Sequence, residues 1–462
     1  MKNIKILFVG LALASATISG IKGQIMIGAT SIDTISIITS LDTPWEILWG
    51  PDNYIWFTER SGKVSRLNPT TGTREILITI AGVHEESESG LLGMTLDRSF
   101  PAQPYVYLVY NYLLSGNIRE RIVRYTYADN VLKDPMTLLE NIIGSVNHNG
   151  SRVAIGPDNK LYMTTGDAQN TSNAQDLNSV NGKILRMNLD GSIPSDNPTN
   201  NSYVWTFGHR NPQGLVFTPN GKLYSSEHGP DNDDELNLIE KGRNYGWPDV
   251  QGFCDGASEM ALCTSWNVRE PLYSWTPTLA VTGIDYYNNA AIPEWKGCIL
   301  MTSLKASKLV SLKLSSDGTG ITGVNDWLVN TFGRLRDICI APDGRIFLAV
   351  SNKDGRGTPK TGDDRIVQIK ARLNTSTPTI LDNSGDIRIY PNPMNTNAQL
   401  QVSDAFAGGK VTIINSTGKF IFGATMKGTT YDLYLHIVIP GYYIVKVDNG
   451  KDIVQASLII TR

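Results

Sequence analysis

Three residues in polar segments of the chain have side chains that together could oxidise an alcohol. His148 stands in the run His-Asn-Gly-Ser-Arg, Asp167 follows nineteen residues later, and Arg210 lies in the run Gly-His-Arg-Asn-Pro-Gln-Gly. An imidazole can take the proton of a hydroxyl while hydride leaves the carbon. The planar fork of an arginine suits the carboxylates of a bound quinone. These residue types predict a face that binds an anionic organic cofactor and acts on a hydroxyl group.

An acidic run and a smaller group of cations extend this predicted face. Residues 231–235 read Asp-Asn-Asp-Asp-Glu and follow the run Ser-Glu-His-Gly-Pro at 226–230. Carboxylates are hard oxygen ligands of the kind that Ca²⁺ prefers, although the glycine that an EF-hand loop requires is missing. Lys305, Arg334 and Arg336 form the cationic group. The pattern predicts a divalent cation beside the organic anion.

Each of these residues also has a plain structural interpretation. His148 could be a core histidine satisfied by Asp167, and Arg210 could pair with an acidic neighbour. The cationic group could belong to a solvated surface, and the acidic run could be a surface turn. His209 and His228 are expected to support loops rather than to react.

The elements that must position these residues share a repeated turn. A strand, a proline followed by Asp or Asn, and a second strand rich in aromatic and aliphatic residues recur at Pro51, Pro157, Pro219 and Pro342. Looser versions lie near residues 100–110 and 293–301. The spacing of roughly 50 to 75 residues fits one four-stranded blade per repeat. We therefore predict an all-β fold, a six-bladed β-propeller, whose loops gather the functional groups on one face. A two-sheet sandwich would not repeat its turn at blade intervals.

Composition excludes one class of partner. The chain has 462 residues, a formal net charge of −3, 41% hydrophobic residues and 43 glycines. Lys and Arg are scattered, so the clustered positive charge that nucleic-acid binding needs is missing. Frequent glycine suits short strands joined by turns.

The N-terminal segment predicts export. A short basic region and an apolar stretch precede Gln24, which is typical of a secretory signal peptide over residues 1–23. A first buried strand or helix is the alternative. No later segment reaches the ~18 apolar residues that a membrane span requires. Of the four cysteines, Cys254 and Cys263 have a spacing that suits a small loop disulfide, but the sequence does not settle the pairing.

The C-terminal segment predicts a separate domain. Polar residues at 373–385 are typical of a linker. Residues 386–462 open with Ile-Arg-Ile-Tyr-Pro-Asn-Pro and include the strand Gly-Tyr-Tyr-Ile-Val-Lys-Val, which indicates a small β-sandwich. Both phrases resemble the type A sorting domain of the type IX secretion system. That resemblance implies recognition by secretion machinery, export across an outer membrane, and a secreted or cell-surface location. An accessory β domain is the alternative.

Residues 45–369 resemble the soluble quinoprotein glucose/sorbosone dehydrogenases. The phrases that carry the resemblance occur in the family's order, and we predict the propeller domain over residues 32–372. They are Gly-Leu-Leu-Gly at 90–93, Gly-Lys-Ile-Leu-Arg at 182–186, Gly-His-Arg-Asn-Pro-Gln-Gly at 208–214, Asp-Glu-Leu-Asn at 234–237 and Asn-Tyr-Gly-Trp-Pro at 244–248.

The resemblance implies a role for each matching residue. His148 is similar to the family's general base, Asp167 to its orienting carboxylate, and Arg210 with Asn211 to contacts of the quinone oxygens of PQQ. Lys305, Arg334 and Arg336 are similar to residues that bind the carboxylates of PQQ. The carbonyls of Gly229 and Pro230 are similar to ligands of a Ca²⁺ ion that also binds PQQ. Glu235 and Tyr245 are similar to residues of a second, structural Ca²⁺ site.

Three departures from the family's pattern bear on specificity. Glu88, which the resemblance implies to be a contact of the cofactor and sugar pocket, stands where relatives carry an amide. Ser151 replaces a glycine of a His-Asn-Gly-Gly phrase. The segment between Trp247 and Trp275 is short compared with the dimeric glucose dehydrogenases, which favours a monomer and leaves glucose preference open.

The expected function is oxidation of the C1 hydroxyl of an aldose to a lactone, with PQQ and Ca²⁺ as cofactors and an external electron acceptor. Two rival functions remain open. One is a binding propeller without catalysis, and the other is a Ca²⁺-dependent lactonase-type hydrolase. The hydrolase would need carboxylate and amide side chains on its central ion, whereas the matching contacts here are backbone carbonyls.

Overall fold

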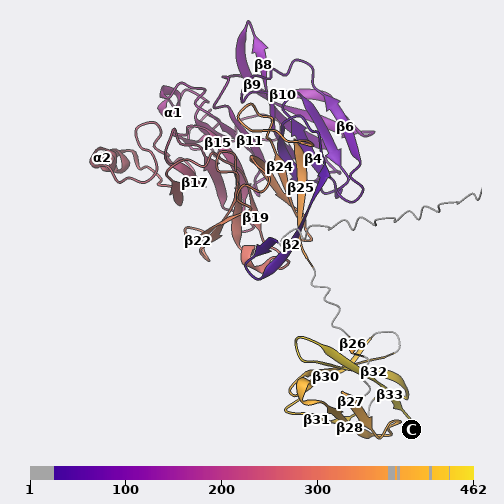
Figure 1. Ribbon diagram of the computed structural model, residues 1–462. Helices are drawn as coiled ribbons and strands as arrows, with labels where there is room; N and C mark the ends of the chain where they lie inside the picture. The colour runs from indigo at the N-terminus through magenta and orange to yellow at the C-terminus, as the bar shows by residue number, and fades with distance from the viewer. Residues whose placement is uncertain (1–24, 373–379, 382–385, 416–418, 436–437, 462) are drawn as a thin grey trace, which may run out of the picture. The chain divides into compact units, whose positions relative to one another are not determined.

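The computed structural model describes residues 25–372, 380–381, 386–415, 419–435 and 438–461. The chain divides into two units, Met1–Ala371 and Arg372–Arg462. The predicted signal peptide at 1–23 lies outside the described residues, as does the predicted linker at 373–385 apart from residues 380–381. Figure 1 shows both units.

Six antiparallel sheets form the first unit, and five of them are each built from four consecutive strands. The first three sheets contain β3 (Pro44–Trp49), β4 (Ile55–Glu59), β5 (Lys63–Leu67) and β6 (Arg74–Thr79); β7 (Leu91–Leu96), β8 (Tyr105–Leu114), β9 (Asn117–Ala128) and β10 (Val131–Ile143); and β11 (Gly150–Ile155), β12 (Leu161–Thr165), β13 (Lys183–Met187) and β14 (Val204–Phe207). The next two contain β15 (Pro212–Phe217), β16 (Leu223–Glu227), β17 (Asp234–Ile239) and β18 (Tyr273–Trp275); and β19 (Val281–Tyr287), β20 (Cys298–Ser303), β21 (Leu309–Leu314) and β22 (Ile321–Trp327).

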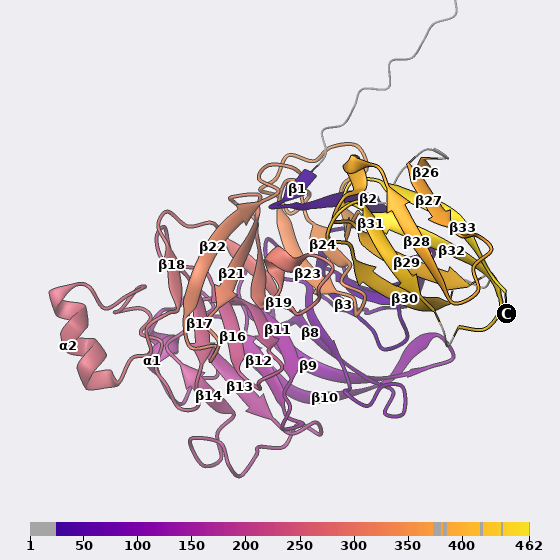
Figure 2. The ribbon, with the colours of Figure 1, turned by 90° about the horizontal axis from the view of Figure 1, so that it is seen from below.

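The sixth sheet joins the two ends of the unit. It orders β1 (Ile25–Ile27), β2 (Thr30–Ile38), β25 (Arg365–Ala371), β24 (Ile346–Val350) and β23 (Leu335–Ile340). The N-terminal β2 pairs antiparallel with β25, so the indigo and orange ends of the unit meet in one sheet (Figures 1 and 2). The first strands of the sheets, β3, β7, β11, β15, β19 and β23, contact one another in turn around a ring. This arrangement confirms the predicted six-bladed propeller.

The repeated turn connects the first two strands of a blade, and the same side-chain hydrogen bond recurs in it. In four blades the side chain of an Asp or Asn accepts a hydrogen bond from the backbone N–H two residues later. The pairs are Asp52 with Tyr54, Asp158 with Lys160, Asn220 with Lys222 and Asp343 with Arg345. The residue between them has a positive φ in each case, which Asn and Gly tolerate. The local sequence therefore determines this turn.

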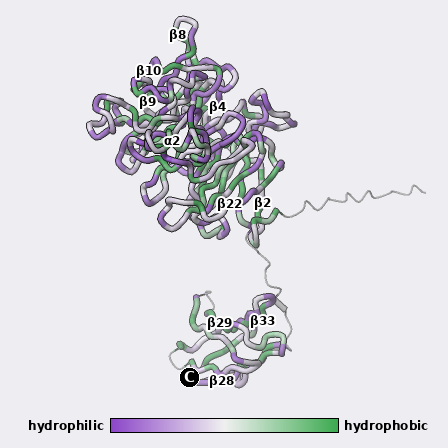
Figure 3. Tube along the Cα trace, turned by 90° about the vertical axis from the view of Figure 1, so that its left-hand side faces the viewer, coloured by the Kyte–Doolittle hydropathy of each residue, from purple (hydrophilic) through white to green (hydrophobic). Residues whose placement is uncertain are grey.

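Apolar side chains of neighbouring blades share the cores of the first unit. Trp56 of the first blade packs in one cluster with Val106 and Tyr125 of the second, and Tyr224 of the fourth blade packs with Ile299 of the fifth. Figure 3 shows hydrophobic residues concentrated along the strands and hydrophilic residues in many of the connecting loops. Burial at about 25 cal/mol per Å² makes these clusters the main stabilising contribution. The polar loops are left to carry the site.

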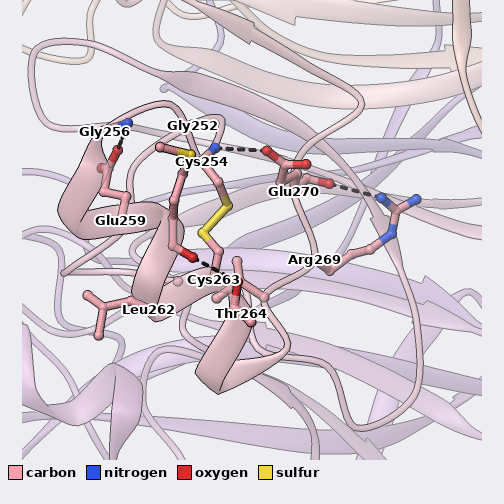
Figure 4. Close-up of a disulfide and its surroundings, with 12 residues drawn as sticks. Gly252, Cys254, Gly256, Glu259, Leu262, Cys263, Thr264, Arg269 and Glu270 are labelled. Atoms are coloured by element: carbon pink, nitrogen blue, oxygen red, sulfur yellow. Dashed lines mark hydrogen bonds between the residues drawn. A yellow bond between two sulfur atoms is a disulfide. The ribbon is translucent and has the colours of Figure 1, made fainter.

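Three short helices interrupt the blades: α1 (Ser172–Gln175), α2 (Ala257–Trp266) and the 3₁₀ helix η1 (Pro293–Trp295). The segment around α2 is stapled by a disulfide between Cys254 and Cys263 (Figure 4). The N–H of Cys254 donates to Glu270, which ties the base of the segment to the chain that follows α2. Cys298 and Cys339 are buried and free. No helix among the described residues is long and apolar enough to span a membrane.

The second unit has two sheets that share one hydrophobic core. One orders β26 (Ile380–Leu381), β33 (Ile453–Ile460), β32 (Gly441–Asp448), β29 (Lys410–Asn415) and β30 (Phe420–Thr425). The other orders β27 (Ile387–Tyr390), β28 (Asn397–Val402) and β31 (Thr430–Tyr434), and a 3₁₀ helix η2 (Asp404–Phe406) follows β28. Leu400, Leu433, Val445 and Leu458 from both sheets are fully buried together. Two sheets around one core agree with the predicted small β-sandwich.

Candidate active site

All six blades contribute to one cavity of about 490 Å³. Its lining residues come from the loops that enter the first strand of each blade and from those that join the second and third strands. Six of them are cationic and four are acidic. The cationic residues are Arg60, Arg210, Lys305, Arg334, Arg336 and Arg356, and the acidic ones are Glu88, Asp231, Asp234 and Asp354. Such a surplus of positive charge suits an anionic ligand.

His148 and Asp167 form a hydrogen-bonded pair at the cavity wall. The Nδ1 of His148 lies 2.8 Å from Oδ1 of Asp167, which is 1% exposed. Because a carboxylate only accepts, Nδ1 carries the proton and the neutral ring keeps a lone pair on Nε2. The imidazole is 18% exposed and lines the cavity, and no described residue makes a hydrogen bond with Nε2. The pair has the arrangement of a base and its orienting carboxylate.

Backbone geometry explains why these two residues meet. His148 has a φ of 60°, and a Cβ at Gly166 would overlap its carbonyl oxygen. Only glycine therefore lets the loop before β11 approach the end of β12 so closely. Asp167 also donates its N–H to the carbonyl of Arg210 at 2.8 Å. That bond joins the loop of the base to the loop of the arginine.

Arg210 and Asn211 present unpaired N–H groups near the cavity. Nε of Arg210 and Nδ2 of Asn211 are buried without a hydrogen-bond partner among the described residues. Burial lowers the pKa of Arg210, although Asp167 and Glu227 oppose the effect. Glu227 holds this loop, because its carboxylate accepts from the N–H of Arg210 and pairs with His209. Buried donors without partners are costly, so they point to a ligand.

The predicted cationic group lines the same cavity. Lys305 donates to Thr278 at 2.9 Å, and Arg334 forms an ion pair with Asp354 at 2.7 Å. Arg336 donates to Gln213 at 2.9 Å, while its Nε is buried without a partner among the described residues. Burial lowers the pKa of Arg336 to about 10, against the charge of Asp354. The structure brings all three cations to the cavity, where Arg336 is buried and Arg334 partly buried, whereas Lys305 is exposed.

Glu88 forms an ion pair with an arginine that the sequence did not single out. Its Oε1 lies 3.0 Å from Nη1 of Arg356, and its Oε2 accepts from the N–H of His148 at 3.2 Å. Burial raises the pKa of Glu88, but the charges of His228 and Arg356 outweigh this, and the pKa lies below its ordinary value. The family's amide position thus carries an ion-paired carboxylate beside His148.

The predicted Ca²⁺ contacts lie at the same cavity. Gly229 and Pro230 line it, and their carbonyl oxygens accept no hydrogen bond from any described residue. Asp234 is fully buried and accepts from the N–H groups of Gly229, Leu279 and Val281, so it pins this loop to the next one. Among the described residues, no group of three or more His, Cys, Asp or Glu is spaced to hold a metal ion.

Glu235 and Tyr245 lie in a second, smaller cavity beside the first. Gly229, Pro230 and Arg210 line both cavities. Burial, and then the charge of Glu227, raise the pKa of Glu235 to about 8. The hydroxyl of Tyr245 donates to the carbonyl of Leu238, so its side chain is already satisfied. Glu227 is paired with His209, whereas Glu235 accepts only from Asn237 and the N–H of Gly252 and has no cationic partner among the described residues. A buried carboxylate of this kind is a group that a metal ion would stabilise.

Ser151, the other departure from the family's pattern, lies behind the site. Its hydroxyl donates to Glu120, a fully buried carboxylate of β9. Burial raises the pKa of Glu120 to about 8, and the hydrogen bond from Ser151 opposes that shift. The serine thus supplies a donor to an acid that has no cationic partner among the described residues.

Sequence reasoning missed four residues that shape the site: Gln213, Trp247, Asp354 and Arg356. Gln213 and Trp247 stand inside the quoted phrases at 208–214 and 244–248, which was the available signal. Asp354 and Arg356 lie in the run Asn-Lys-Asp-Gly-Arg-Gly, which has no distinctive chemistry. Only the fold places that loop over the cavity.

Comparison with known proteins identifies the first unit. A model of the glucose/sorbosone dehydrogenase family matches residues 41–359. The chain belongs to the glucose/sorbosone dehydrogenase family. It is therefore a member of a family of oxidoreductases. Quinoprotein glucose dehydrogenase B of Acinetobacter calcoaceticus is 33% identical over 70% of this chain and 86% of its own length. An aldose sugar dehydrogenase of Escherichia coli is 28% identical over 68% of this chain and 89% of its length.

Solved structures of this family show the same fold. The PQQ-bound form of an aldose sugar dehydrogenase from Streptomyces coelicolor has a TM-score of 0.65 and 33% identity, covering 74% of this chain and 98% of its own. Residues 388–461 match the secretion system C-terminal sorting domain. This member of the glucose/sorbosone dehydrogenase family therefore carries a sorting domain C-terminal to its propeller in the sequence.

Proposed function

We propose that this chain oxidises the C1 hydroxyl of an aldose to the lactone, using PQQ and Ca²⁺ bound in the propeller cavity. The observation that carries the proposal is the His148–Asp167 pair on a cavity rich in cations. The PQQ-bound relative and the quinoprotein relative support the choice of cofactor. Which aldose is used is left to experiment, because pocket loops vary on a fixed scaffold.

The residues present fit an anionic quinone. PQQ carries carboxylates and quinone oxygens, and the site offers cations for the first and N–H donors for the second. Lys305, Arg334 and Arg336 would hold the carboxylates. Arg210 and Asn211 would hold the quinone oxygens, because their buried Nε and Nδ2 have no partner among the described residues. When bound, PQQ would accept the hydride from C1, and Ca²⁺ would polarise its reacting carbonyl.

Backbone carbonyls and one carboxylate fit the metal. The oxygens of Gly229 and Pro230 would bind the Ca²⁺ in the main cavity, where they accept no hydrogen bond from a described residue. The carboxylate of Glu235 would hold a second, structural Ca²⁺ in the smaller cavity, together with the backbone carbonyl of Tyr245, whose hydroxyl is already engaged. Oxygen ligands of these kinds are those that Ca²⁺ prefers.

His148 performs the proton transfer. Asp167 holds the Nδ1–H, which leaves the Nε2 lone pair to take the proton of the C1 hydroxyl. The imidazolium that forms is stabilised by the same carboxylate. Glu88 holds the backbone of His148 from the other side and offers a negative acceptor to sugar hydroxyls. The two electrons then leave to an external acceptor.

The chain organisation supports export. We propose a signal peptide at 1–23, a catalytic propeller at 32–372, a linker at 373–385 and a sorting domain at 386–462. The sorting-domain match supports recognition by secretion machinery, transfer across an outer membrane, and a secreted or cell-surface enzyme. The disulfide between Cys254 and Cys263 suits an oxidising compartment. We propose that the enzyme acts as a monomer.

Reconstitution tests the proposal. PQQ and CaCl₂ are added to the purified protein, and reduction of an artificial electron-acceptor dye is followed with a panel of aldoses. We expect turnover that requires PQQ and is lost in His148→Ala, while PQQ binding persists. Binding without turnover across the panel would favour the binding propeller. Lactone hydrolysis that needs Ca²⁺ but not PQQ would favour the hydrolase.

A further inference from the structure

One indole side chain lies between the two halves of the proposed site. Nε1–H of Trp247 donates to Oδ2 of Asp167 at 3.0 Å. The ring of the same tryptophan faces the guanidinium of Arg210, whose Cζ lies 5.3 Å from the ring centroid. The other oxygen of Asp167 pairs with His148. Trp247 thus contacts both the carboxylate behind the base and the arginine beside it.

We infer that Trp247 is a positioning residue that aligns the proton-accepting pair and the arginine of this site. The inference rests on the proposed function and extends it to a residue to which neither the family resemblance nor the comparisons give a role. The N–H would fix the carboxylate of Asp167, and the ring face would fix the guanidinium of Arg210. These two contacts can be separated by substitution.

The N–H contact restricts how the carboxylate of Asp167 can turn. Its Oδ1 pairs with His148 and also accepts from the N–H of Gln169 at 2.8 Å. Turning the carboxylate out of its present plane would break the bond to the indole. An indole N–H only donates, so it cannot compete for the proton on Nδ1 of the imidazole. The bond therefore stabilises the one orientation in which Nε2 faces the cavity.

The ring contact supports an arginine that few hydrogen bonds hold. The Nε of Arg210 has no partner among the described residues, and its Nη1 makes one long contact of 3.4 Å with the carbonyl of His228. A guanidinium against an indole face gains cation–π attraction without using its N–H groups. The ring thus orients Arg210 and leaves its donors for a ligand.

Trp247 is itself held by its backbone. Its N–H donates to the carbonyl of Gly208 at 3.1 Å, and its carbonyl accepts from Gln175 at 2.7 Å. Gln175 ends α1, in the loop that begins at Asp167. The indole is therefore presented from a fixed backbone, as a positioning role requires.

Three variants separate the two contacts. Trp247→Phe keeps the ring and removes the N–H, Trp247→Leu removes both, and Trp327→Phe is the matched control. Nε1–H of Trp327 donates to Ser311 at 2.8 Å in the outer strands of the fifth blade. We expect Trp247→Phe to lower kcat about tenfold, with KM for the aldose and Kd for PQQ changed less than threefold. Trp247→Leu should in addition weaken PQQ binding about tenfold, and the control should change neither constant.

A double-mutant cycle and an NMR signal test the bond directly. In the Asp167→Asn background, Trp247→Phe should change kcat less than twofold, because the shared interaction is already altered. The indole N–H resonance that disappears in Trp247→Phe should shift in Asp167→Asn. An unchanged kcat in Trp247→Phe, additive effects in the cycle, or an indole signal that ignores Asp167→Asn would each overturn the inference.

The same measurements distinguish this inference from the proposed function. A wild-type protein that neither binds PQQ nor turns over an aldose overturns the proposed function. The indole signal then decides by itself whether Trp247 positions Asp167. Normal wild-type turnover with a fully active Trp247→Phe overturns only the inference.

Discussion

Two histidine–carboxylate pairs in neighbouring loops have the same hydrogen bond and opposite environments. Nδ1 of His148 lies 2.8 Å from Asp167, and Nδ1 of His209 lies 2.8 Å from Glu227. The first imidazole is 18% exposed at the cavity, whereas the second is fully buried. The Nε2 of His209 is also occupied, because Thr206 donates to it at 2.9 Å.

This difference decides what each pair can do. With both ring nitrogens engaged and its face stacked on Tyr245, His209 has no lone pair to offer a substrate. It instead holds Glu227, which in turn holds the backbone of Arg210. Whether a histidine–carboxylate pair can act as a base therefore depends on whether the second ring nitrogen is free and reaches the cavity. The length of the hydrogen bond to the carboxylate does not distinguish the two pairs.

The largest expected difference between the pairs is in turnover. His148→Ala should lower kcat about 10³-fold, because a general base contributes ~10²–10⁴-fold, and should leave Tm within a few degrees. His209→Gln should lower Tm more than His148→Ala and lower kcat far less. Steady-state kinetics and thermal unfolding of both PQQ-loaded variants measure this contrast. Equal losses of kcat would contradict the assignment of the base.

The cationic wall offers the next test, because it should bind the cofactor without taking a proton. Arg336→Met should weaken PQQ binding about 100-fold, since a buried charged contact is lost. Its kcat at saturating PQQ should fall less than that of His148→Ala. Arg345→Met is the control, because Arg345 pairs with Asp343 in a turn outside the cavity. Titration of PQQ by fluorescence measures both, and an equal effect in the control would contradict the placement.

A pH measurement sharpens the comparison with a buried acid that lacks an imidazole. The pKa of Glu120 is raised to about 8 in the folded protein, so this group favours folding when protonated. This contribution to stability is fully present below pH 4.5 and is lost as the pH rises towards 8. Between these two values the carboxyl group is ionised in the unfolded chain and protonated in the folded protein. Glu120→Gln should therefore gain Tm relative to wild type by about 3 °C or more between pH 5 and pH 8.

The control for that measurement is Glu140→Gln. The carboxylate of Glu140 is half exposed, and its ion pair with Arg121 is long, at 3.9 Å. Its Tm difference from wild type should change less between the two pH values than that of Glu120→Gln, because this carboxylate is half exposed. A Glu120→Gln difference that is independent of pH would show that the folded protein does not hold Glu120 in its protonated form.

The smallest expected effect concerns the second nitrogen of the structural pair. Thr206→Val keeps the shape and removes the hydroxyl that donates to His209. We expect a loss of about 1 kcal/mol in stability and an unchanged kcat. Chemical denaturation and dye-reduction assays measure the two. Loss of turnover comparable with that of His148→Ala would mean that His209 takes part in the reaction.

Much of the fold followed from local chemistry. The Asp and Asn turns at residues 52, 158, 220 and 343 recur because each side chain accepts from its own backbone two residues on. When apolar strands flank a repeated turn, a propeller lets each four-stranded blade bury its apolar side chains against the neighbouring blade. The closing pair of β2 with β25 was not predicted, because it joins residues more than three hundred positions apart.

The sequence indicated the residue types of the candidate site better than it indicated the contacts between its loops. The structure brings the predicted residues, apart from Asp167 and Asn211, to the main cavity or to the smaller cavity beside it, and their roles there stay predictions. Arg356 and Asp354 were missed because nothing in their local run marks them. Their role depends on a loop of the last blade meeting loops of the second and third.

The sequence by itself therefore determined the turns, the blade repeat, the family phrases and the sorting-domain signature, since each depends on residues close together in the chain. Only the tertiary structure decided which histidine keeps a free ring nitrogen, which carboxylate of the cavity is paired with Arg356, and which indole links Asp167 to Arg210. Those properties depend on burial and on hydrogen bonds between distant loops. Such contacts exist only once the six blades have closed.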